Sequence, residues 1–425
     1  MANRILLSGG HVIDPSQGID GVADVLLVDG KIAAIDGSAH DAKVVDAKGK
    51  LVVPGFVDLG TQLREPGHEE DETILSGTAA ALAGGFTSIA CLPETDPPID
   101  TPAAVEFVRQ KASRAKNCNV FVLASVSKNR DGKELSEIGS LVEAGAVGFS
   151  DATHPLVNSE LLRRALEYCL MFDKPILTHP EVPELSRGGV MHEGMVSLVL
   201  GLAGMPSEAE DVMVSRDVRL AESTGGRLHV LGISSRESCD ILRRAKDRKV
   251  RITAGISPCN FSLNDEELRS FDSHFKVNPP FRSPKHIEAC IGALRDGTID
   301  IISSGHAPRA SEKTLVELDV APFGISSLET TLGIVGQYLV RPGHLTWLQV
   351  IEKLSLNPAK LLGIPKGTLK VGADADVVLI DPTQEWTVTP NKFCSKSSNT
   401  PCGGKVLLGK VSSVFVAGEE KPICG

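Results

Sequence analysis

The segment from Pro54 to Arg64 contains the residue types and spacing that say most about chemistry in this chain. It has the pattern of a strand, along which side chains alternate, so the side chains of residues 60 and 62 point the same way. Two histidines at that spacing would supply two ligands of a metal ion. The chain instead has Gly60, which has no side chain, and Gln62, whose amide is a poor substitute for imidazole. We therefore expect no metal on this strand.

The middle of the chain alternates short apolar runs with longer amphipathic segments, as parallel strands do when each returns through a helix. Eight such units predict a closed (β/α)8 TIM-type barrel, with its chemistry at the C-terminal ends of the strands. An open doubly wound sheet is the competing fold, but no GxGxxG motif follows a strand. The eight apolar runs are 56–63, 87–92, 120–126, 146–150, 175–178, 228–233, 250–256 and 299–303.

The two ends of the chain share a different pattern. Short alternating strands punctuated by turns occupy residues 4–53, and residues 367–420 resume that style. Neither half buries enough surface alone, so we expect them to pair into one small β-sandwich beside the barrel. The predicted division is 1–54 for the N-terminal part of the sandwich, 55–362 for the barrel and 363–425 for the C-terminal part of the sandwich.

The composition excludes several classes of function. The 425 residues are 42% hydrophobic and 23% charged, as in a soluble globular protein. A net charge of −10 without a long Lys/Arg run argues against nucleic acid or a membrane surface as a partner. No apolar stretch approaches the ~20 residues of a membrane span, and the N-terminal apolar run is too short for a signal peptide, so we expect a cytoplasmic protein. The nine scattered cysteines lack a CxxC pair and are expected to be reduced thiols, mostly in the core.

Seven motifs, in order along nearly the whole chain, resemble those of bacterial dihydroorotases of the long-chain class. This resemblance implies an amidohydrolase barrel with a β-sandwich, and the reversible cyclisation of carbamoyl aspartate, normally on zinc. The motifs are PGFVDxxxxLREPG at 54–67, PxTxPPxD at 93–100, GAVxFSD at 145–151, KVNPPxR at 276–282, HAP at 306–308, APFG at 321–324 and SKSxNTP at 395–401.

The resemblance also implies six metal ligands, of which only two are present. Asp151 follows the fourth strand and His179 the fifth. A catalytic zinc normally needs about three protein ligands plus water, so these remnant ligands alone should hold it weakly. We therefore expect no metal cofactor and no catalytic residue, since the position of the family's general base is also lost. The four lost ligand positions are Gly60, Gln62, Gly232 and Gly305, the last being the position of that base.

A rebuilt metal site is the alternative to a lost one. Four residues could in principle take part in it, although each is better explained as an ordinary loop or surface residue. They are His306, His68, His154 and Cys259.

Substrate-binding positions are altered less than the metal positions. Arg64 and Asn278 stand where the family binds the carboxylate and ring of dihydroorotate. Glu94 replaces an asparagine, and its carboxylate would oppose that of the substrate or pair with Arg64 and close the pocket from within. Arg309 replaces a histidine and could meet an anion or neutralise Glu94. These vestigial residues could bind a ligand or only hold loops around an empty pocket.

The main functional prediction is a dihydroorotase-like protein of pyrimidine biosynthesis that is catalytically inactive, a pseudoenzyme. The resemblance implies a structural or regulatory role as a partner of aspartate transcarbamoylase, in a hetero-oligomer with that enzyme, and we also expect a homodimer. One alternative is an active cyclic amidohydrolase, dihydroorotase or related, with an atypical metal site. A second alternative is a scaffold with an unrelated partner.

Overall fold

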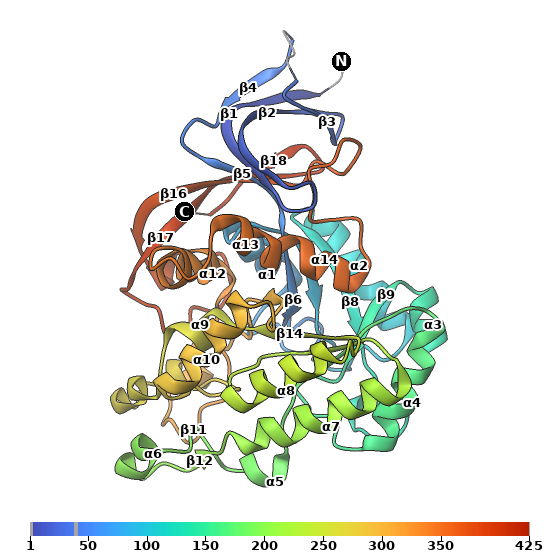
Figure 1. Ribbon diagram of the computed structural model, residues 1–425, viewed down its shortest axis with the longest axis vertical. Coiled ribbons are helices and arrows are strands. Elements are labelled where there is room, and N and C mark those ends of the chain that lie inside the picture. The colour runs from blue at the N-terminus through green and yellow to red at the C-terminus, as the bar shows by residue number, and fades with distance from the viewer. Residues whose placement is uncertain (1–2, 38–40, 425) are drawn as a thin grey trace.

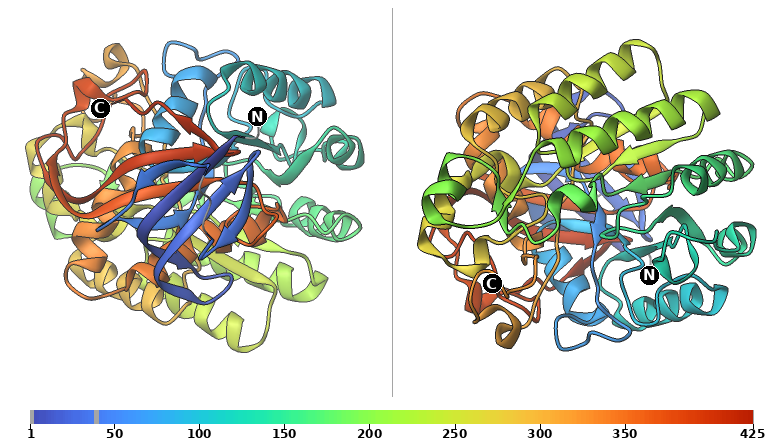
Figure 2. Two further views of the ribbon diagram at one scale, coloured as in Figure 1. Left: turned by 90° about the horizontal axis from the view of Figure 1, so that it is seen from above. Right: turned by 90° about the horizontal axis from the view of Figure 1, so that it is seen from below.

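The computed structural model describes residues 3–37 and 41–424, and its central feature is a sheet of eight parallel strands. Each strand lies beside its neighbour in the sequence, and the helices ring the strands (Figure 2). The predicted TIM-type barrel is therefore confirmed, although most strands are shorter than the apolar runs that predicted them. The strands are β6 (Phe56–Thr61), β7 (Phe86–Cys91), β8 (Asn119–Ala124), β9 (Ala146–Ser150), β10 (Ile176–Thr178), β13 (Leu228–Val230), β14 (Ile252–Ile256) and β15 (Ile301–Ile302).

Two serines after β15 connect the last strand of this sheet to the first. The Ser303 hydroxyl donates to the carbonyl oxygen of Leu59 on β6. The backbone N–H of Ser304 donates to Oδ1 of Asp58 at 2.6 Å, and its hydroxyl donates to Oδ2 at 2.8 Å. Asp58 is fully buried, so these hydrogen bonds satisfy a carboxylate that would otherwise be costly to bury. They bring β15 against β6 and curl the sheet.

Helices pack their apolar sides on the strands, as the amphipathic segments predicted (Figure 1). In α8, for example, Cys239, Leu242 and Ala245 are buried while the charged side chains face outward. None of the helices in the described part of the chain is long and apolar enough to cross a membrane. The main flanking helices are α1 (Ile74–Ala83), α2 (Pro102–Ala115), α3 (Ile138–Glu143), α4 (Ser159–Leu170), α7 (Glu208–Thr224), α8 (Arg236–Asp247), α10 (Pro284–Arg295) and α14 (Asn357–Leu362).

Strands from the two ends of the chain form one sheet with its own core, above the barrel in Figure 1. The link between the ends is the antiparallel pair β5 and β16, in which Val53 lies opposite Val378. The N- and C-terminal segments therefore meet as predicted, while the boundaries at 54 and 362 stay a prediction. The strands are β1 (Arg4–Asp14), β2 (Ile19–Val28), β3 (Lys31–Ile35), β4 (Lys43–Asp46), β5 (Leu51–Pro54), β16 (Val377–Thr387), β17 (Val406–Val416) and β18 (Glu419–Lys421).

One cysteine pair corrects the prediction of reduced thiols. Cys394 and Cys424 form a disulfide between the loop after β16 and the C-terminal end of the chain. The two cysteines are 30 residues apart in the sequence, and nothing in the sequence indicated that they pair, because they meet only through the tertiary fold. The other seven cysteines are free and buried, in agreement with the prediction that most pack in the core.

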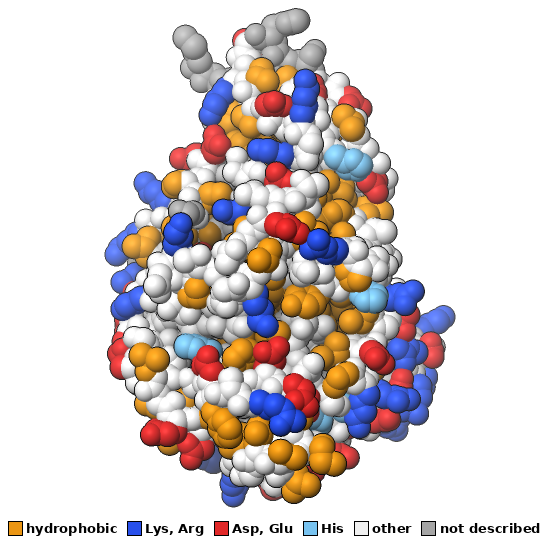
Figure 3. Space-filling model, turned by 90° about the vertical axis from the view of Figure 1, so that its left-hand side faces the viewer, with side chains coloured by type: hydrophobic (Ala, Val, Ile, Leu, Met, Phe, Trp, Pro, Cys, Tyr) orange, Lys and Arg blue, Asp and Glu red, His pale blue; other side chains and the backbone are white. Residues whose placement is uncertain are grey.

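Basic and acidic side chains are interspersed on the face shown in Figure 3, and hydrophobic side chains gather near its lower end. The short helix α6 (Met195–Leu200), at the lower left of Figure 1, exposes Met195, Leu198 and Val199. The expected homodimer and the expected absence of a nucleic-acid partner stay predictions.

Candidate active site

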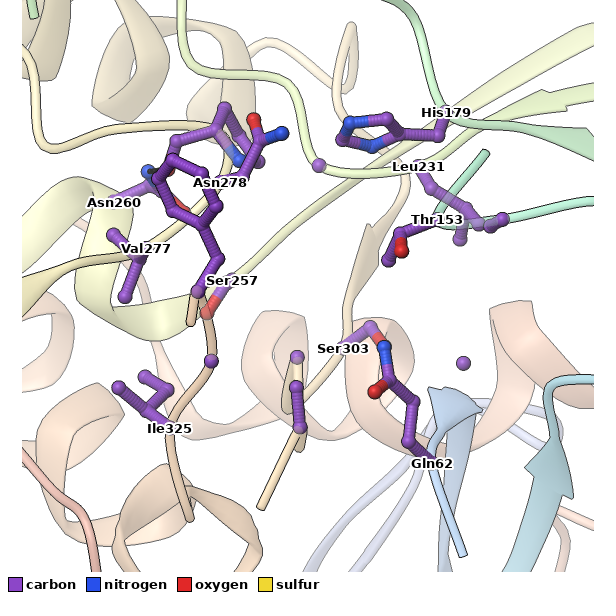
Figure 4. A pocket seen from close by; sticks show the side chains of 18 of the residues that line it. Gln62, Thr153, His179, Leu231, Ser257, Asn260, Val277, Asn278, Ser303 and Ile325 are labelled. Carbon is purple, nitrogen blue, oxygen red and sulfur yellow. Dashed lines mark hydrogen bonds between the residues drawn. The ribbon is translucent and has the colours of Figure 1, made fainter. Parts of the chain in front are cut away.

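A cavity of about 400 Å³ lies at the C-terminal ends of the barrel strands, where the sequence predicted the chemistry. Much of its wall is apolar, from side chains such as Leu92, Val277 and Phe281. In Figure 4, His179 and Asn278 lie along one side of the cavity, and Gln62 rises from β6 on the opposite side. The polar side chains that line it are Gln62, Thr153, His179, Ser257, Asn260, Asn278, Ser303 and Arg309.

Asp151, one of the two remnant ligands, does not line this cavity. Its Oδ1 accepts hydrogen bonds from the backbone N–H groups of Val126 at 2.8 Å and Ser127 at 3.1 Å, and its Oδ2 accepts one from the Ser127 hydroxyl. Burial raises the pKa of Asp151, although the hydrogen bonds from Ser127 and Val126 oppose that change. Both oxygens are therefore engaged in anchoring the loop after β8.

All three glycines at the lost ligand positions have backbone conformations that favour glycine, Gly60 with a φ of +91°. At the other two, a Cβ would also be crowded. Gly232 has a φ of +63° and Gly305 a φ of +67°, in the left-handed region that costs other residues about 1–2 kcal/mol. A Cβ at Gly232 would lie 3.0 Å from Cδ of Pro279, and one at Gly305 would lie 3.0 Å from Oγ of Ser257. Histidine or aspartate side chains would strain the loops at both positions.

The donor set of the described residues therefore does not fit the zinc that the family uses. Within residues 3–37 and 41–424, no three His, Cys, Asp or Glu side chains come together in a way that could hold a metal ion. The remnant ligand Asp151 is engaged by backbone and hydroxyl donors, and His179 bonds to a carboxylate.

His179 is held by a carboxylate that the sequence analysis missed. Its Nε2 lies 3.0 Å from Oε2 of Glu181, and the same oxygen accepts a hydrogen bond from Nδ2 of Asn278 at 2.5 Å. The Ser186 hydroxyl donates to the other oxygen of Glu181. Burial raises the pKa of Glu181, but the hydrogen bonds from His179, Ser186 and Asn278 outweigh it and lower the pKa to about 2. The sequence His179-Pro180-Glu181 places the carboxylate two residues after the imidazole, and this spacing was the available signal.

The free nitrogen of His179 gives the site a base. Nδ1 makes no hydrogen bond to any residue that the structure describes, whereas Nε2 bonds to an ionised carboxylate. This partner favours the neutral tautomer with its proton on Nε2, which leaves the lone pair of Nδ1 available. In Figure 4 the imidazole ring projects from the end of β10 into the cavity. His179 can therefore accept a proton from a molecule bound there.

The carboxylate of Glu94 pairs with two arginines and a threonine. Its Oε1 lies 3.5 Å from Nη1 of Arg64, and its Oε2 lies 3.9 Å from Nη2 of Arg130, a partner that the sequence analysis missed. The backbone N–H and hydroxyl of Thr153 donate to Oε2 at 3.3 and 3.1 Å. Burial raises the pKa of Glu94, but Arg64, Arg130 and Arg309 outweigh it and lower the pKa. The pairing considered from the sequence is thus present, and neither Arg64 nor Glu94 lines the cavity.

Arg309 lines the cavity but already has partners. Its Nε donates to the carbonyl oxygen of Phe323 at 3.1 Å, and its Nη1 lies 3.5 Å from Oδ2 of the buried Asp71. Lys313 also contacts Asp71, at 3.0 Å. Arg309 therefore helps to hold loops at the mouth of the barrel.

The four residues considered for a rebuilt metal site contact different partners and do not form one cluster. Nε2 of His306 is 3.4 Å from Oε2 of Glu72, deep in the protein. Nδ1 of His154 contacts the carbonyl oxygen of Arg130 at 3.2 Å, and His68 lies on the surface beside Glu70. Only Cys259 lines the cavity, and its pKa is raised well above the usual value by the hydrogen bond with Cys402 and by burial. The structure does not bring these four together.

Comparisons with protein families and with individual proteins both find similarity to dihydroorotases. A family described as Dihydro-orotase-like matches residues 49–238. The dihydroorotase of Pelotomaculum thermopropionicum is 48% identical over 418 residues, which cover 98% of this chain and 97% of that protein. The dihydroorotase of Syntrophus aciditrophicus is 48% identical over 419 residues, covering 98% of each chain. The structure of L-hydantoinase from Arthrobacter aurescens has a TM-score of 0.89 at 24% identity, covers 100% of this chain and 97% of its own, and supports the fold alone.

These relatives contradict the main functional prediction. Proteins named dihydroorotase, at 48% identity over nearly the full length, support the first alternative, an active cyclic amidohydrolase. The prediction of an inactive partner of aspartate transcarbamoylase is therefore wrong. It took the loss of four metal-ligand positions as the loss of the reaction, and did not consider the base formed by His179 with Glu181.

Proposed function

The chain belongs to the dihydroorotase family, and we propose that it is a cyclic amidohydrolase, a dihydroorotase or related enzyme, with an atypical active site. The observation that carries this proposal is the 48% identity to dihydroorotases over 98% of the chain. The cavity adds support, because it retains Asn278 and combines it with the polar pair of His179 and Glu181. No step of the reaction is assigned to zinc, because the described residues do not fit it.

In the proposed reaction, His179 is the general base and then the general acid. A water oxygen attacks the carbonyl carbon of the ring amide while its proton passes to Nδ1 of His179. The carbon–nitrogen bond of the resulting tetrahedral intermediate then breaks, and His179 returns the proton to the departing nitrogen. The reverse sequence closes the ring and releases water. General acid–base catalysis of this kind contributes about 10²–10⁴-fold.

Glu181 positions His179 for both steps. Its ionised carboxylate keeps the proton of the neutral imidazole on Nε2, so that Nδ1 faces the water. When Nδ1 takes the proton, the negative charge 3.0 Å away stabilises the imidazolium ion. Asn278 holds the same carboxylate oxygen from the other side, at 2.5 Å. These three side chains act as one unit.

The test is turnover by chelator-treated protein with two ring compounds, L-dihydroorotate and its analogue without the carboxylate, 5,6-dihydrouracil. We expect ring opening of at least one, or closure of its ring-opened form, above the rate in buffer. His179→Gln should lower kcat by about 10²-fold or more. The matched control is His11→Gln on β1, in the terminal sheet, which should leave kcat unchanged.

Two results would overturn the proposal. One is the absence of turnover of both compounds in both directions. The other is turnover that the chelator abolishes, because that would require a metal site which the described residues do not form. The expected cytoplasmic location and the expected homodimer stay predictions, to be checked by cell fractionation and by light scattering.

A further inference from the structure

Charge is almost absent from the part of the cavity that a ring would contact, while a carboxylate of the protein itself lies behind it. We propose that the cavity takes an uncharged cyclic ureide, a ring containing –CO–NH–CO–NH– and no carboxylate, and that the carboxamide of Gln62 binds its amide edge. This inference rests on the proposed function and names the class of ligand for that site.

The first argument is that the carboxylate of Glu94 already pairs with two arginines near the cavity. Arg64, at 3.5 Å, and Arg130, at 3.9 Å, face it, and Thr153 donates two hydrogen bonds to its Oε2. Arg64 is 1% exposed and does not line the cavity, so a ligand there does not reach its guanidinium. Nη2 of Arg64 has no hydrogen-bond partner within the described structure, but it is buried outside the cavity lining, so a ligand carboxylate placed near Thr153 would meet the negative charge of Glu94.

Arg309 does not replace this lost anion site. It is the one arginine among the residues that line the cavity, and its Nε and Nη1 are engaged by the Phe323 carbonyl oxygen and by Asp71. With Nε and Nη1 engaged in this way, only Nη2 of Arg309 remains for a ligand, which is less than the paired donors that a free guanidinium offers to a carboxylate.

The second argument is that Gln62 has a buried polar atom without a partner. Its Oε1 makes no hydrogen bond within the described structure, although the residue is 4% exposed and lines the cavity. A buried acceptor left unsatisfied costs about 1–3 kcal/mol, so a ligand that donates to it gains stability. In Figure 4 the carboxamide of Gln62 points into the cavity, toward the side where Thr153 and His179 lie.

A carboxamide matches the amide edge of a cyclic ureide. The ring N–H can donate to Oε1 of Gln62, and the amide nitrogen of Gln62 can donate to the neighbouring ring carbonyl oxygen. This pairing would place a ring carbonyl on the same side of the cavity as His179, the proposed base. The apolar side chains of Leu92, Val277 and Phe281 would cover the ring carbons. Gln62, at a lost metal-ligand position, would thus determine specificity.

The experiment compares two ligands that differ only in the carboxylate. Isothermal titration would measure the Kd of 5,6-dihydrouracil and of L-dihydroorotate for the wild-type chain, for Glu94→Gln and for Gln62→Leu. We expect the wild type to bind dihydrouracil at least tenfold more tightly than dihydroorotate. Glu94→Gln should shift that ratio at least tenfold toward dihydroorotate, since it removes the opposing charge. Gln62→Leu should weaken dihydrouracil binding at least tenfold.

The matched control is Glu288→Gln on the exposed side of α10, which should leave the ratio unchanged. Wild-type protein that prefers dihydroorotate, or binds both ligands equally, would overturn the inference while leaving the proposed function standing, because turnover is measured separately. Failure to bind either ligand would also overturn it. The wild-type ratio decides the question even if Glu94→Gln does not fold.

Discussion

Glu181 holds His179 through Nε2, at 3.0 Å, and thereby leaves Nδ1 of the imidazole facing the cavity without a hydrogen-bond partner among the residues that the structure describes. The pair sits directly after β10, on a short stretch that a proline and the hydrogen bonds from Ser186 and Asn278 keep in place. An imidazole oriented by a carboxylate is a general base that depends on no metal.

Replacing Glu181 tests this orientation. Glu181→Gln keeps the size of the side chain but removes the charge, so the neutral tautomer of His179 is no longer fixed and the imidazolium ion is less stable. We expect kcat to fall about 10–10²-fold with little change in KM, and the pH at which activity falls on the acid side to move down. A pH profile of kcat measures both effects. Loss of activity through unfolding alone would leave the profile of the remaining activity in place.

The same carboxylate should make stability depend on acid. The pKa of Glu181 is lowered from 4.5 to about 2, so its contribution is present above pH 4.5 and is lost as the pH falls toward 2. Its full size is on the order of 3 kcal/mol. Urea unfolding between pH 6 and pH 2 should show a smaller loss in Glu181→Gln than in the wild type. An equal loss in both proteins would contradict the prediction.

Asp151 should behave as a loop anchor rather than as a metal ligand. Asp151→Ala leaves the backbone N–H groups of Val126 and Ser127 without their acceptor, and we expect it to lower the free energy of unfolding by about 1–3 kcal/mol. Metal content, measured by elemental analysis, should stay the same, and kcat per folded molecule should be unchanged. A fall in bound zinc would show that Asp151 is a ligand after all.

Restoring the lost side chains should be costly. Gly232→His and Gly305→Asp each place a side chain where φ is +63° or +67°, so each should lower the free energy of unfolding by about 1–2 kcal/mol or more. The control is Gly292→Ala inside α10, where a Cβ meets nothing within 4 Å and should stabilise the helix by about 0.5–1 kcal/mol. Chemical denaturation measures all three. Unchanged stability in the first two variants would contradict the account of these loops.

The sequence predicted the barrel well because its signals are local. Each apolar run corresponds to a strand, and the strand at 146–150 is buried throughout. One of the amphipathic segments between the runs forms α8, with Leu242 on the buried side. The candidate site was predicted less completely because its decisive contacts join distant segments. Arg130 reaches Glu94, and Asn278 reaches Glu181 across 97 residues, which no periodicity reveals.

The positions of Gly232 and Gly305 show a second limit. The sequence identifies them as glycines, but only the structure shows that the backbone there lies in the left-handed region. The residue types alone did not reveal this backbone conformation.

The pairing of β5 with β16 has a consequence for how the chain is made. Val53 lies opposite Val378, which is synthesised more than three hundred residues later. During translation, the sheet formed by β1, β2 and β5 therefore has an unpaired edge until β16 is made. The barrel, which lies between β5 and β16 in the sequence, can fold in the meantime. The terminal sheet is completed last. A chain that stops before β16 would therefore expose an unpaired strand edge, and such fragments should aggregate or be degraded.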